Sequence, residues 1–327
     1  MTLRTRVTDL LGIRYPIVQG GMQNVGYAQL AAAVSNAGGL GVITALTFAD
    51  PGALAREIAA CRALTRAPFG VNISVFPTMR PPDYDAIVDA IADGGVGIVE
   101  TAGTPEVRAV WDLLFARGIR VIHKCTSVRH AVSSERYGVH AVSIDGFECA
   151  GHPGEDDVPG LVLIPAAVDR LSVPVLASGG IADGRGLAAA LALGADGVTM
   201  GTRFCATREA PIHDNVKQAY IDKDERETDI LFRPFRNSAR VGRNAISTEV
   251  LRRTSQPNAV FAEVAELVSG QRGKALLQSG EIDSGVYWAS MAQGLIHDIP
   301  SCGDLIDRMV VDARAIVAER LAAMVSD

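Results

Sequence analysis

The feature that most constrains the fold is a regular alternation of short β-rich runs with longer helical stretches, which continues to about residue 205. Several runs, such as VPVLAS at 173–178, are apolar almost throughout, the pattern of parallel strands buried on both faces. Eight such runs separated by helices predict an α/β protein with a (β/α)8 barrel, the TIM-barrel architecture. The predicted strands are Pro16–Gly20, Gly41–Ala45, Phe69–Val75, Val96–Thr101, Arg120–Cys125, Ala141–Asp145, Val173–Ala177 and Gly197–Met200.

The stretches between these runs are predicted to be helices. One begins at Pro51 directly after Asp50, which pairs an N-cap residue with a proline in the first turn. The competing architecture is an open doubly wound sheet, whose dinucleotide site needs Gly-x-Gly-x-x-Gly after the first strand. Neither the glycines that follow residue 19 nor AGGLG at 37–41 has that spacing, so the barrel is favoured. The predicted helices are Ala28–Ala37, Pro51–Leu64, Glu106–Arg117, Ser127–Tyr137, Leu161–Arg170 and Gly186–Leu193.

The remainder of the chain has a different character. Residues 209–300 are predicted to form helices and loops only. They contain clusters of charged residues and glycines that mark turns. The last segment could supply the helix that a barrel needs after its eighth strand. We therefore expect a barrel domain from 1–208 plus 303–327, and a helical lid from 209–302. The last segment carries apolar residues at helical spacing, namely Ile306, Val310, Ala313, Val317 and Leu321.

Composition narrows the function classes. The 327 residues are 48% hydrophobic and carry a formal charge of -6, so binding to nucleic acid or an anionic membrane is not expected. The five cysteines form no Cys-x-x-Cys pair, which argues against a disulfide framework and against a zinc site. The first residues lack the apolar core of a signal peptide, and no apolar run reaches membrane length. We therefore expect a cytoplasmic protein, and the sequence leaves open whether it forms a homodimer.

Two neighbouring strand ends carry glycines that suit a phosphate. In (β/α)8 enzymes the active site lies at the carboxyl ends of the strands, and phosphate is often held after strands seven and eight. The seventh predicted strand leads into Ser178, Gly179 and Gly180, and the eighth into Gly201 and Thr202. Backbone N–H groups of such glycines can approach a phosphate closely. Each loop alone reads as an ordinary turn, but two on adjacent strands favour a phosphate site.

Three other strand ends favour a flat ligand. The first strand ends in Gly20, Gly21 and Met22, which leave room for a flat molecule against the backbone, and Asn72 offers a side-chain amide from the third strand. Lys124 ends the fifth strand, where a merely solvated lysine is the ordinary interpretation. Beside a phosphate site, however, a cation suits a ring that becomes an anion, and FMN has both the phosphate and such a ring.

The segment DGFECAGHPGEDD at 145–157 places a single histidine, His152, in a loop after the sixth strand. Histidine is the natural proton acceptor near neutral pH, although a lone loop histidine is more often structural. The three acidic residues at 155–157 could raise the pKa of the imidazole or cap the next helix. A metal loop is disfavoured because no second histidine stands at ligand spacing. Cys149 is expected to be a buried thiol rather than a nucleophile.

Six segments together resemble the nitronate monooxygenase family, formerly called 2-nitropropane dioxygenases, over nearly the whole chain. These segments are QGGMQ (19–23), HKCTSVRHA (123–131), DGFECAGHPGEDD (145–157), SGGIADGRG (178–186), MGTRF (200–204) and RNAIS (243–247). The resemblance implies an FMN-bound barrel that oxidises alkyl nitronates with O2 to a carbonyl compound and nitrite, with His152 as the base for neutral nitroalkanes. It implies FMN contacts at Gly21, Met22, Asn72, Lys124, Ala150, Ser178, Gly179, Gly180, Gly201 and Thr202.

Departures from the family pattern leave the substrate open. The best-known members carry an AGGHRG-like segment around the histidine, whereas CAGHPGEDD resembles a branch that acts as NAD(P)H:quinone reductase. In that branch an aromatic residue follows QGGMQ, where this chain has Asn24. A polar residue that could meet NADH or NADPH is replaced by Met79, with Arg80 beside it as an alternative contact for a cofactor phosphate. Nitronate oxidation is favoured narrowly over quinone reduction.

Two further alternatives have less support. An FMN-dependent enoyl-acyl-carrier reductase would need a basic docking surface, and this acidic chain shows none in its sequence. A non-catalytic flavin-binding barrel would not need His152 and Lys124, although both residues also have structural explanations. Tyr287 and Trp288 in the lid are candidates to line the pocket, and core packing is an equal alternative for both.

Overall fold

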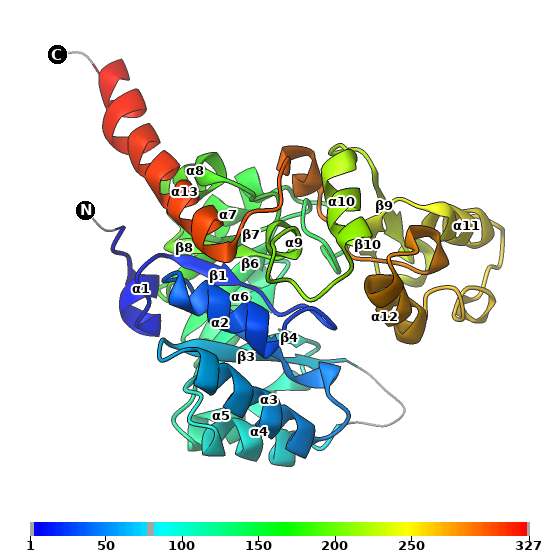
Figure 1. Cartoon of the computed structure of the whole chain (residues 1–327), viewed down its shortest axis with the longest axis horizontal. Coiled ribbons are helices and arrows are strands. Elements are labelled where there is room, and N and C mark those ends of the chain that lie inside the picture. The colour runs from blue at the N-terminus through cyan, green and yellow to red at the C-terminus, as the bar shows by residue number, and fades with distance from the viewer. Residues whose placement is uncertain (1–2, 77–81, 326–327) are drawn as a thin grey trace.

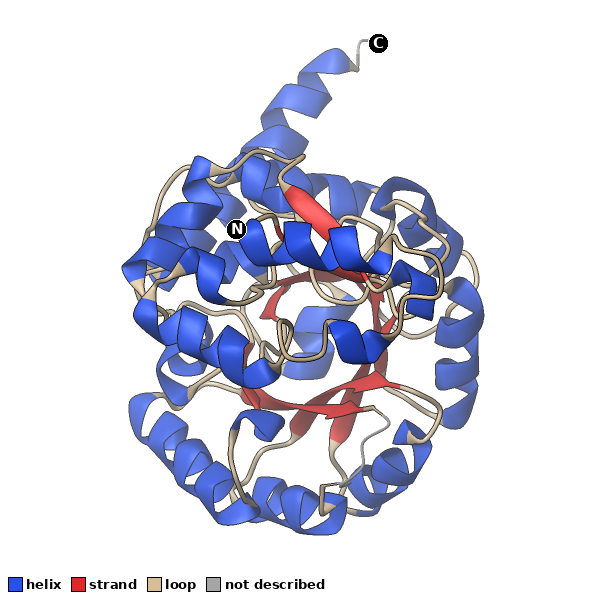
Figure 2. Cartoon of the chain, turned by 90° about the vertical axis from the view of Figure 1, so that its right-hand side faces the viewer, coloured by secondary structure: helices blue, strands red, loops and turns tan. Residues whose placement is uncertain are grey.

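The centre of the molecule is a parallel barrel. The computed structural model describes residues 3–76 and 82–325. Eight parallel strands follow the order β1-β8-β7-β6-β5-β4-β3-β2, and a bridge between Val18 and Leu40 brings the two end strands together. Figure 2 shows these strands in red, encircled by helices, which confirms the predicted (β/α)8 fold. The strands are β1 (Ile17–Gln19), β2 (Gly41–Thr44), β3 (Phe69–Val75), β4 (Ile98–Gly103), β5 (Arg120–Cys125), β6 (Ala141–Asp145), β7 (Val175–Ser178) and β8 (Gly197–Met200).

Helices surround the barrel and reverse the chain between strands (Figure 1). The helix directly after β8 is the short α9 (Thr202–Cys205). The helix α13 (Cys302–Ala315), near the end of the chain, packs against α8 and α2. The Asp50 carboxylate accepts a hydrogen bond from the Ala53 N–H at 2.8 Å, the cap that the sequence predicts for α3. The other helices of this layer are α2 (Ala28–Asn36), α3 (Pro51–Leu64), α4 (Tyr84–Asp93), α5 (Val107–Ala116), α6 (Val128–Tyr137), α7 (Gly160–Val168) and α8 (Gly184–Ala192).

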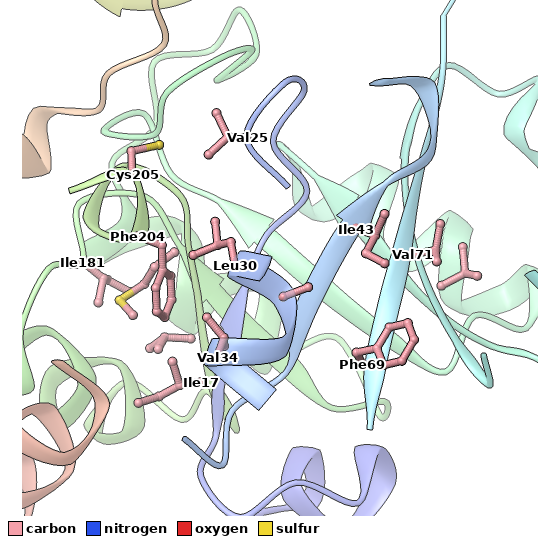
Figure 3. Packing of buried hydrophobic residues seen from close by; sticks show 14 of the residues in the cluster. Ile17, Val25, Leu30, Val34, Ile43, Phe69, Val71, Ile181, Phe204 and Cys205 are labelled. Atoms are coloured by element: carbon pink, nitrogen blue, oxygen red, sulfur yellow. The ribbon is translucent and has the colours of Figure 1, made fainter. Parts of the chain in front are cut away.

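Most of the apolar core lies between the strands and the surrounding helices. Figure 3 shows Ile17, Val71 and Phe204 packed in this layer among other buried side chains. A second, smaller cluster joins Val18 and Ile98 to residues of helix α1 (Arg6–Leu11). Because these strand residues lie early in their strands, α1 closes the amino-terminal end of the barrel. The opposite end, where the strands finish, is left for the site.

The segment after the barrel is not made of helices and loops alone, as the sequence suggested. An antiparallel hairpin pairs β9 (Thr228–Leu231) with β10 (Ala239–Gly242). The hairpin packs with α11 (Ala245–Thr254) around a small core of its own that includes Leu231, Val241 and Val250. The segment also contains α10 (Asp214–Asp222) and α12 (Gly270–Ser279).

The last helix meets the barrel over only part of its length. Ile306, Val310 and Ala313 are buried against the body, as their spacing predicts. Val317 and Leu321, which continue the same stripe, are 50% and 42% exposed. Figure 1 shows why, because the end of this helix projects beyond the barrel. The apolar face of this helix is therefore buried only as far as Ala313.

Candidate active site

A cavity of about 780 Å³ lies at the carboxyl ends of the barrel strands and extends to the β9–β10 hairpin and α12. Both belong to residues 209–302, for which the name lid is kept as a label only. All the residues that the sequence analysis selected for cofactor or substrate line the cavity. They are Gly20, Gly21, Met22, Asn72, Lys124, Ala150, His152, Ser178, Gly179, Gly180, Gly201, Thr202, Tyr287 and Trp288. The exceptions are Met79 and Arg80, which lie outside the described residues. Residues from seven separate segments thus meet in one cavity, while their roles stay predictions.

The floor of the cavity is polar because of the alternation along the strands. Ile98 and Ile122 face the apolar closed end of the barrel, and two residues later Glu100 and Lys124 face the same interior. The Lys124 ammonium contacts the Asp145 carboxylate at 3.1 Å. Burial alone would lower the pKa of Lys124, but the carboxylates of Asp145 and Glu100 outweigh it, and the net effect raises that pKa. Lys124 is therefore a cation throughout the physiological range.

Glu100 is a buried residue that the sequence analysis missed. Its Oε1 accepts hydrogen bonds from the Gly21 N–H at 2.8 Å and from the Asn72 amide at 2.9 Å, while Oε2 has no partner in the described part of the chain. Burial raises the pKa of this carboxyl, and Lys124 offsets part of that effect. A Cβ atom at Gly21 would lie 2.2 Å from Asn72 Cγ, so a glycine is required at this contact. The sequence does contain an indication of this residue, because Glu100 is a carboxylate inside the otherwise mostly apolar run VGIVETAG.

The ends of β7 and β8 present unpaired backbone donors to the cavity. Gly179 and Gly180 have φ angles of +92° and +76°, conformations that glycine adopts without strain. In the part of the chain that the structure describes, the N–H groups of Gly179, Gly180 and Gly201 donate to no acceptor. The Thr202 hydroxyl oxygen accepts a hydrogen bond from the Ser290 N–H at 3.0 Å, and its proton is still available to a ligand. This set of donors suits a phosphate group.

His152 stands at the mouth of the cavity between two aromatic rings. The centroid of its imidazole lies 5.6 Å from that of Phe76 and 5.9 Å from that of Trp288. The imidazole is exposed toward the cavity, yet the protein around it partly excludes water, and this desolvation lowers its pKa while the charge of Glu155 offsets part of the effect. His152 is therefore neutral at pH 7 and able to accept a proton.

The two lid aromatics differ in environment. Trp288 is 40% exposed and faces the cavity. Tyr287 is 1% exposed, packs against Tyr220 and accepts a hydrogen bond from the Lys223 ammonium at 2.9 Å. Tyr287 thus combines the two predicted alternatives, lining the cavity with one edge while packing in the core, whereas Trp288 belongs to the cavity wall.

The acidic residues around His152 mostly hold the loop in place. Glu155 accepts two hydrogen bonds from Ser238 in the lid, and Asp157 pairs with Arg233 at 3.0 Å. Neither caps the next helix, because the N–H of Gly160 at the start of α7 donates instead to the carboxylate of Glu148. Of the three acidic residues at 155–157, only Glu155 contributes to the pKa of His152.

The alternative chemistries suggested by single residues find little support. Cys149 is buried, and its burial raises the pKa of the thiol far above neutrality, so it is not a thiolate nucleophile at pH 7. The described residues contain no group of three or more His, Cys, Asp or Glu side chains arranged for a metal ion. No helix in the described part of the chain is both long enough and apolar enough to cross a membrane.

Comparison with known proteins identifies the family. The family described as nitronate monooxygenase matches residues 4–83 and 78–312 of this chain. A Rhodococcus jostii (strain RHA1) protein named (3aS,4S,5R,7aS)-5-hydroxy-7a-methyl-1-oxo-octahydro-1H-indene-4-carboxyl-CoA dehydrogenase is 33% identical, with coverage of 95% of this chain and 96% of that protein. A probable nitronate monooxygenase of Staphylococcus saprophyticus is 35% identical over 70% of this chain and 75% of its own length.

Solved structures agree with these sequence relatives. FabK from Thermotoga maritima superposes with a TM-score of 0.90 at 33% identity, covering 98% of this chain and 99% of that chain. The nitroalkane oxidase from Streptomyces ansochromogenes superposes with a TM-score of 0.78 at 29% identity, covering 98% and 100% of the two chains. The chain therefore belongs to the nitronate monooxygenase family of FMN-dependent oxidoreductases.

Proposed function

We propose that the protein binds FMN in this cavity and uses it to oxidise alkyl nitronates with O2 to carbonyl compounds and nitrite. The observation that carries the proposal is that a fixed cation, unpaired backbone donors and a neutral histidine line one cavity. The family assignment and the likeness to a nitroalkane oxidase support the reaction class. In this proposal residues 209–302 act as a lid that shapes the substrate side of the cavity.

The residues of the cavity fit FMN. Gly179, Gly180 and Gly201 would hold the phosphate with their free N–H groups, and the hydroxyls of Ser178 and Thr202 would donate beside them. The backbone at Gly20, Gly21 and Met22, with Ala150 on the opposite loop, would line the ring, and Asn72 would meet its polar edge. When bound, FMN supplies a ring that accepts electrons from the substrate.

Lys124 would stabilise negative charge in the cavity. Its ammonium is held at the floor by Asp145 and is charged at every physiological pH. A fixed cation in a site that excludes water stabilises a developing anion without reorganisation of solvent. Lys124 would thereby favour the transfer of electrons to a ring bound in the cavity, and it would also favour binding of an anionic nitronate.

His152 would act as a general base. A neutral nitroalkane must lose its α-proton before it can be oxidised, whereas a nitronate has already lost it. The imidazole is unprotonated at neutral pH and borders the cavity, so it can take that proton. Phe76 and Trp288 limit the positions that the ring can adopt.

A second candidate is NAD(P)H:quinone reduction, which would use the same FMN. The cavity continues past the predicted cofactor residues to Arg236, Val268 and Gly270 in the lid, where a substrate larger than a short nitronate has room. The exposed faces of Phe76 and Trp288 suit stacking with a planar ring such as a nicotinamide or a quinone. The coenzyme A derivative in the name of the Rhodococcus relative is also a large substrate.

Anaerobic stopped-flow absorbance distinguishes these functions. The FMN-loaded protein would be mixed separately with propyl-2-nitronate, NADH and NADPH, and the chemically reduced protein with menadione and crotonyl-CoA. Rapid loss of flavin absorbance with nitronate alone supports the proposal. Rapid loss with a nicotinamide and rapid recovery with menadione assign quinone reduction, while recovery with crotonyl-CoA assigns enoyl reduction. A protein that cannot take up FMN refutes all of these.

A further inference from the structure

The loop that carries His152 is attached to the lid as well as to the barrel. Gly151 and Arg240 exchange two backbone hydrogen bonds, of 3.1 Å and 2.6 Å, so the residue before His152 pairs with the lid strand β10. Four residues further along, Glu155 binds Ser238 on the same side of the lid hairpin. His152 is therefore bracketed by two attachments to the lid.

Arg240 strengthens the first attachment. Its buried guanidinium donates two hydrogen bonds to the carbonyl oxygen of Phe147 and one to the Thr228 hydroxyl. The guanidinium also lies over the Phe147 ring, 4.5 Å from its centroid. No carboxylate within the described residues lies close enough to pair with this cation, so its contacts hold the loop rather than neutralise an acid.

Glu155 forms the second attachment and has a further effect. Its Oε1 accepts the Ser238 N–H and its Oε2 accepts the Ser238 hydroxyl proton, both at 2.7 Å. Ser238 is 1% exposed whereas Glu155 is exposed, so this double contact is buried on the Ser238 side only. Both residues line the cavity beside His152. The carboxylate is thus fixed in position, and its negative charge acts on the imidazole.

The loop needs these attachments because its own backbone is permissive. Gly151 and Gly154, on either side of His152, have φ angles of +78° and +84°. Glycine has more conformational freedom than any other residue, so contacts from outside must select one conformation. A Cβ atom at Gly154 would lie 2.8 Å from the Thr126 hydroxyl oxygen, which shows how closely the loop rests on the barrel.

We propose that Glu155 is a positioning residue for His152, because it fixes the base loop to Ser238 of the lid and keeps a negative charge beside the imidazole. This inference rests on the proposed role of His152 as the base. Other charged groups around the cavity are the Lys124–Asp145 pair on β5 and β6, His130 on α6, Arg236 on the lid hairpin, and the Arg233–Asp157 pair. The Arg233–Asp157 pair also joins this loop to the lid, but of these loop carboxylates only Glu155 acts on the charge of His152.

The test compares three variants of the FMN-loaded protein. Glu155→Gln keeps acceptor and donor atoms for Ser238 but removes the charge, and Ser238→Ala removes one of the two hydrogen bonds but keeps the charge. Asp156→Asn is the matched control, because the neighbouring Asp156 is exposed and does not contribute to the pKa of His152. The titration of His152 would be followed by NMR of histidine-labelled protein, in which six histidines give a tractable spectrum.

We expect His152 to titrate at lower pH in Glu155→Gln than in the parent, and to be unchanged in Asp156→Asn. Ser238→Ala should leave the titration near that of the parent but speed hydrogen exchange at the Gly151 N–H. It should also reduce kcat/KM for 2-nitropropane by about tenfold, less than the ~10²-fold that a 1 Å misplacement can cost, because one of the two hydrogen bonds remains. An unchanged His152 titration in Glu155→Gln would overturn the inference.

This readout separates the inference from the proposed function. The NMR titration and the hydrogen exchange need no substrate, so they report on Glu155 even if the protein does not oxidise nitroalkanes. If the titration shifts as expected while 2-nitropropane is not turned over, the positioning role stands and the proposed reaction fails. If 2-nitropropane is turned over but Glu155→Gln changes neither readout, the reaction stands and the positioning role fails.

Discussion

Replacing Lys124 with methionine tests whether its ammonium compensates the buried carboxylates at the floor of the cavity. Its ammonium lies between the carboxylates of Asp145 and Glu100, and the side chains of Lys124 and Asp145 are only 22% and 9% exposed. Removing one partner of a buried ion pair costs about 3–5 kcal/mol, because the other charge stays buried without compensation. Lys124 keeps some contact with the cavity, so we expect Lys124→Met to destabilise the FMN-free protein by about 3 kcal/mol.

The stability lost in Lys124→Met should depend on pH, and the direction of that dependence can be predicted. Burial already raises the pKa of Glu100 in the folded protein, and loss of the ammonium would raise it further. A group whose folded pKa is raised contributes stability at low pH and loses it as pH rises through that pKa. The deficit of Lys124→Met should therefore be largest at pH 8 and should shrink as pH falls toward the ordinary carboxylate range near pH 4.

Urea unfolding of the FMN-free parent and variants at several pH values measures this prediction. The double variant Lys124→Met/Asp145→Asn should recover part of the lost stability, because one stranded charge is gone, yet it should still retain FMN poorly. Arg4→Met is a control, since its partner Asp9 is exposed and the loss should be undetectable. Parent-like stability of Lys124→Met at pH 8, or a deficit that does not vary with pH, would refute this account of the floor.

Three further predictions concern the site itself. His152→Ala should slow oxidation of neutral 2-nitropropane by about 10²–10⁴-fold and oxidation of its nitronate far less, as steady-state kinetics on both substrates would show; equal losses would contradict a base. In the parent, kcat/KM for 2-nitropropane should fall only below the usual histidine pKa of about 6.5, because desolvation lowers the pKa of His152, and a pH–rate profile would test this. Gly179→Ala places a Cβ 3.0 Å from the Cys149 N at a φ of +92°, so it should weaken FMN binding measured by flavin fluorescence. Gly118→Ala, which is also strained at a φ of +67° but meets open space, should not weaken that binding.

The barrel was predictable because its signals are local. The strands Phe69–Val75, Arg120–Cys125, Ala141–Asp145 and Gly197–Met200 have the predicted bounds, since buried parallel strands are short apolar runs bounded by turns. Helix α4 was missed although its signals are of the same kind, with Asp83 capping the N–H of Ala86 and Ile87 and Ile91 facing the core. That omission reflects an overlooked pattern rather than a limit of the sequence.

Other features depend on partners that are distant in the sequence. The hairpin of β9 and β10 consists of two four-residue strands whose pairing is decided by packing in the lid. The spacing of Val317 and Leu321 defines a helix face, but it cannot say whether anything covers that face. Glu100 acquires its importance from Gly21, which lies in the loop after β1, and from Asn72 on β3. Such contacts exist only after the barrel has closed.

The position of α1 also limits how the enzyme exchanges its substrates. Helix α1 and the apolar layer around Val18 and Ile98 plug the barrel at the end opposite the lid. Under the proposed function, electron donor and electron acceptor would therefore reach the ring from the lid side and leave by the same route. In the alternative function, NAD(P)H and a quinone would need the same face of one ring and could not occupy it together, so the architecture would favour a ping-pong order in which the oxidised nicotinamide departs before the quinone enters.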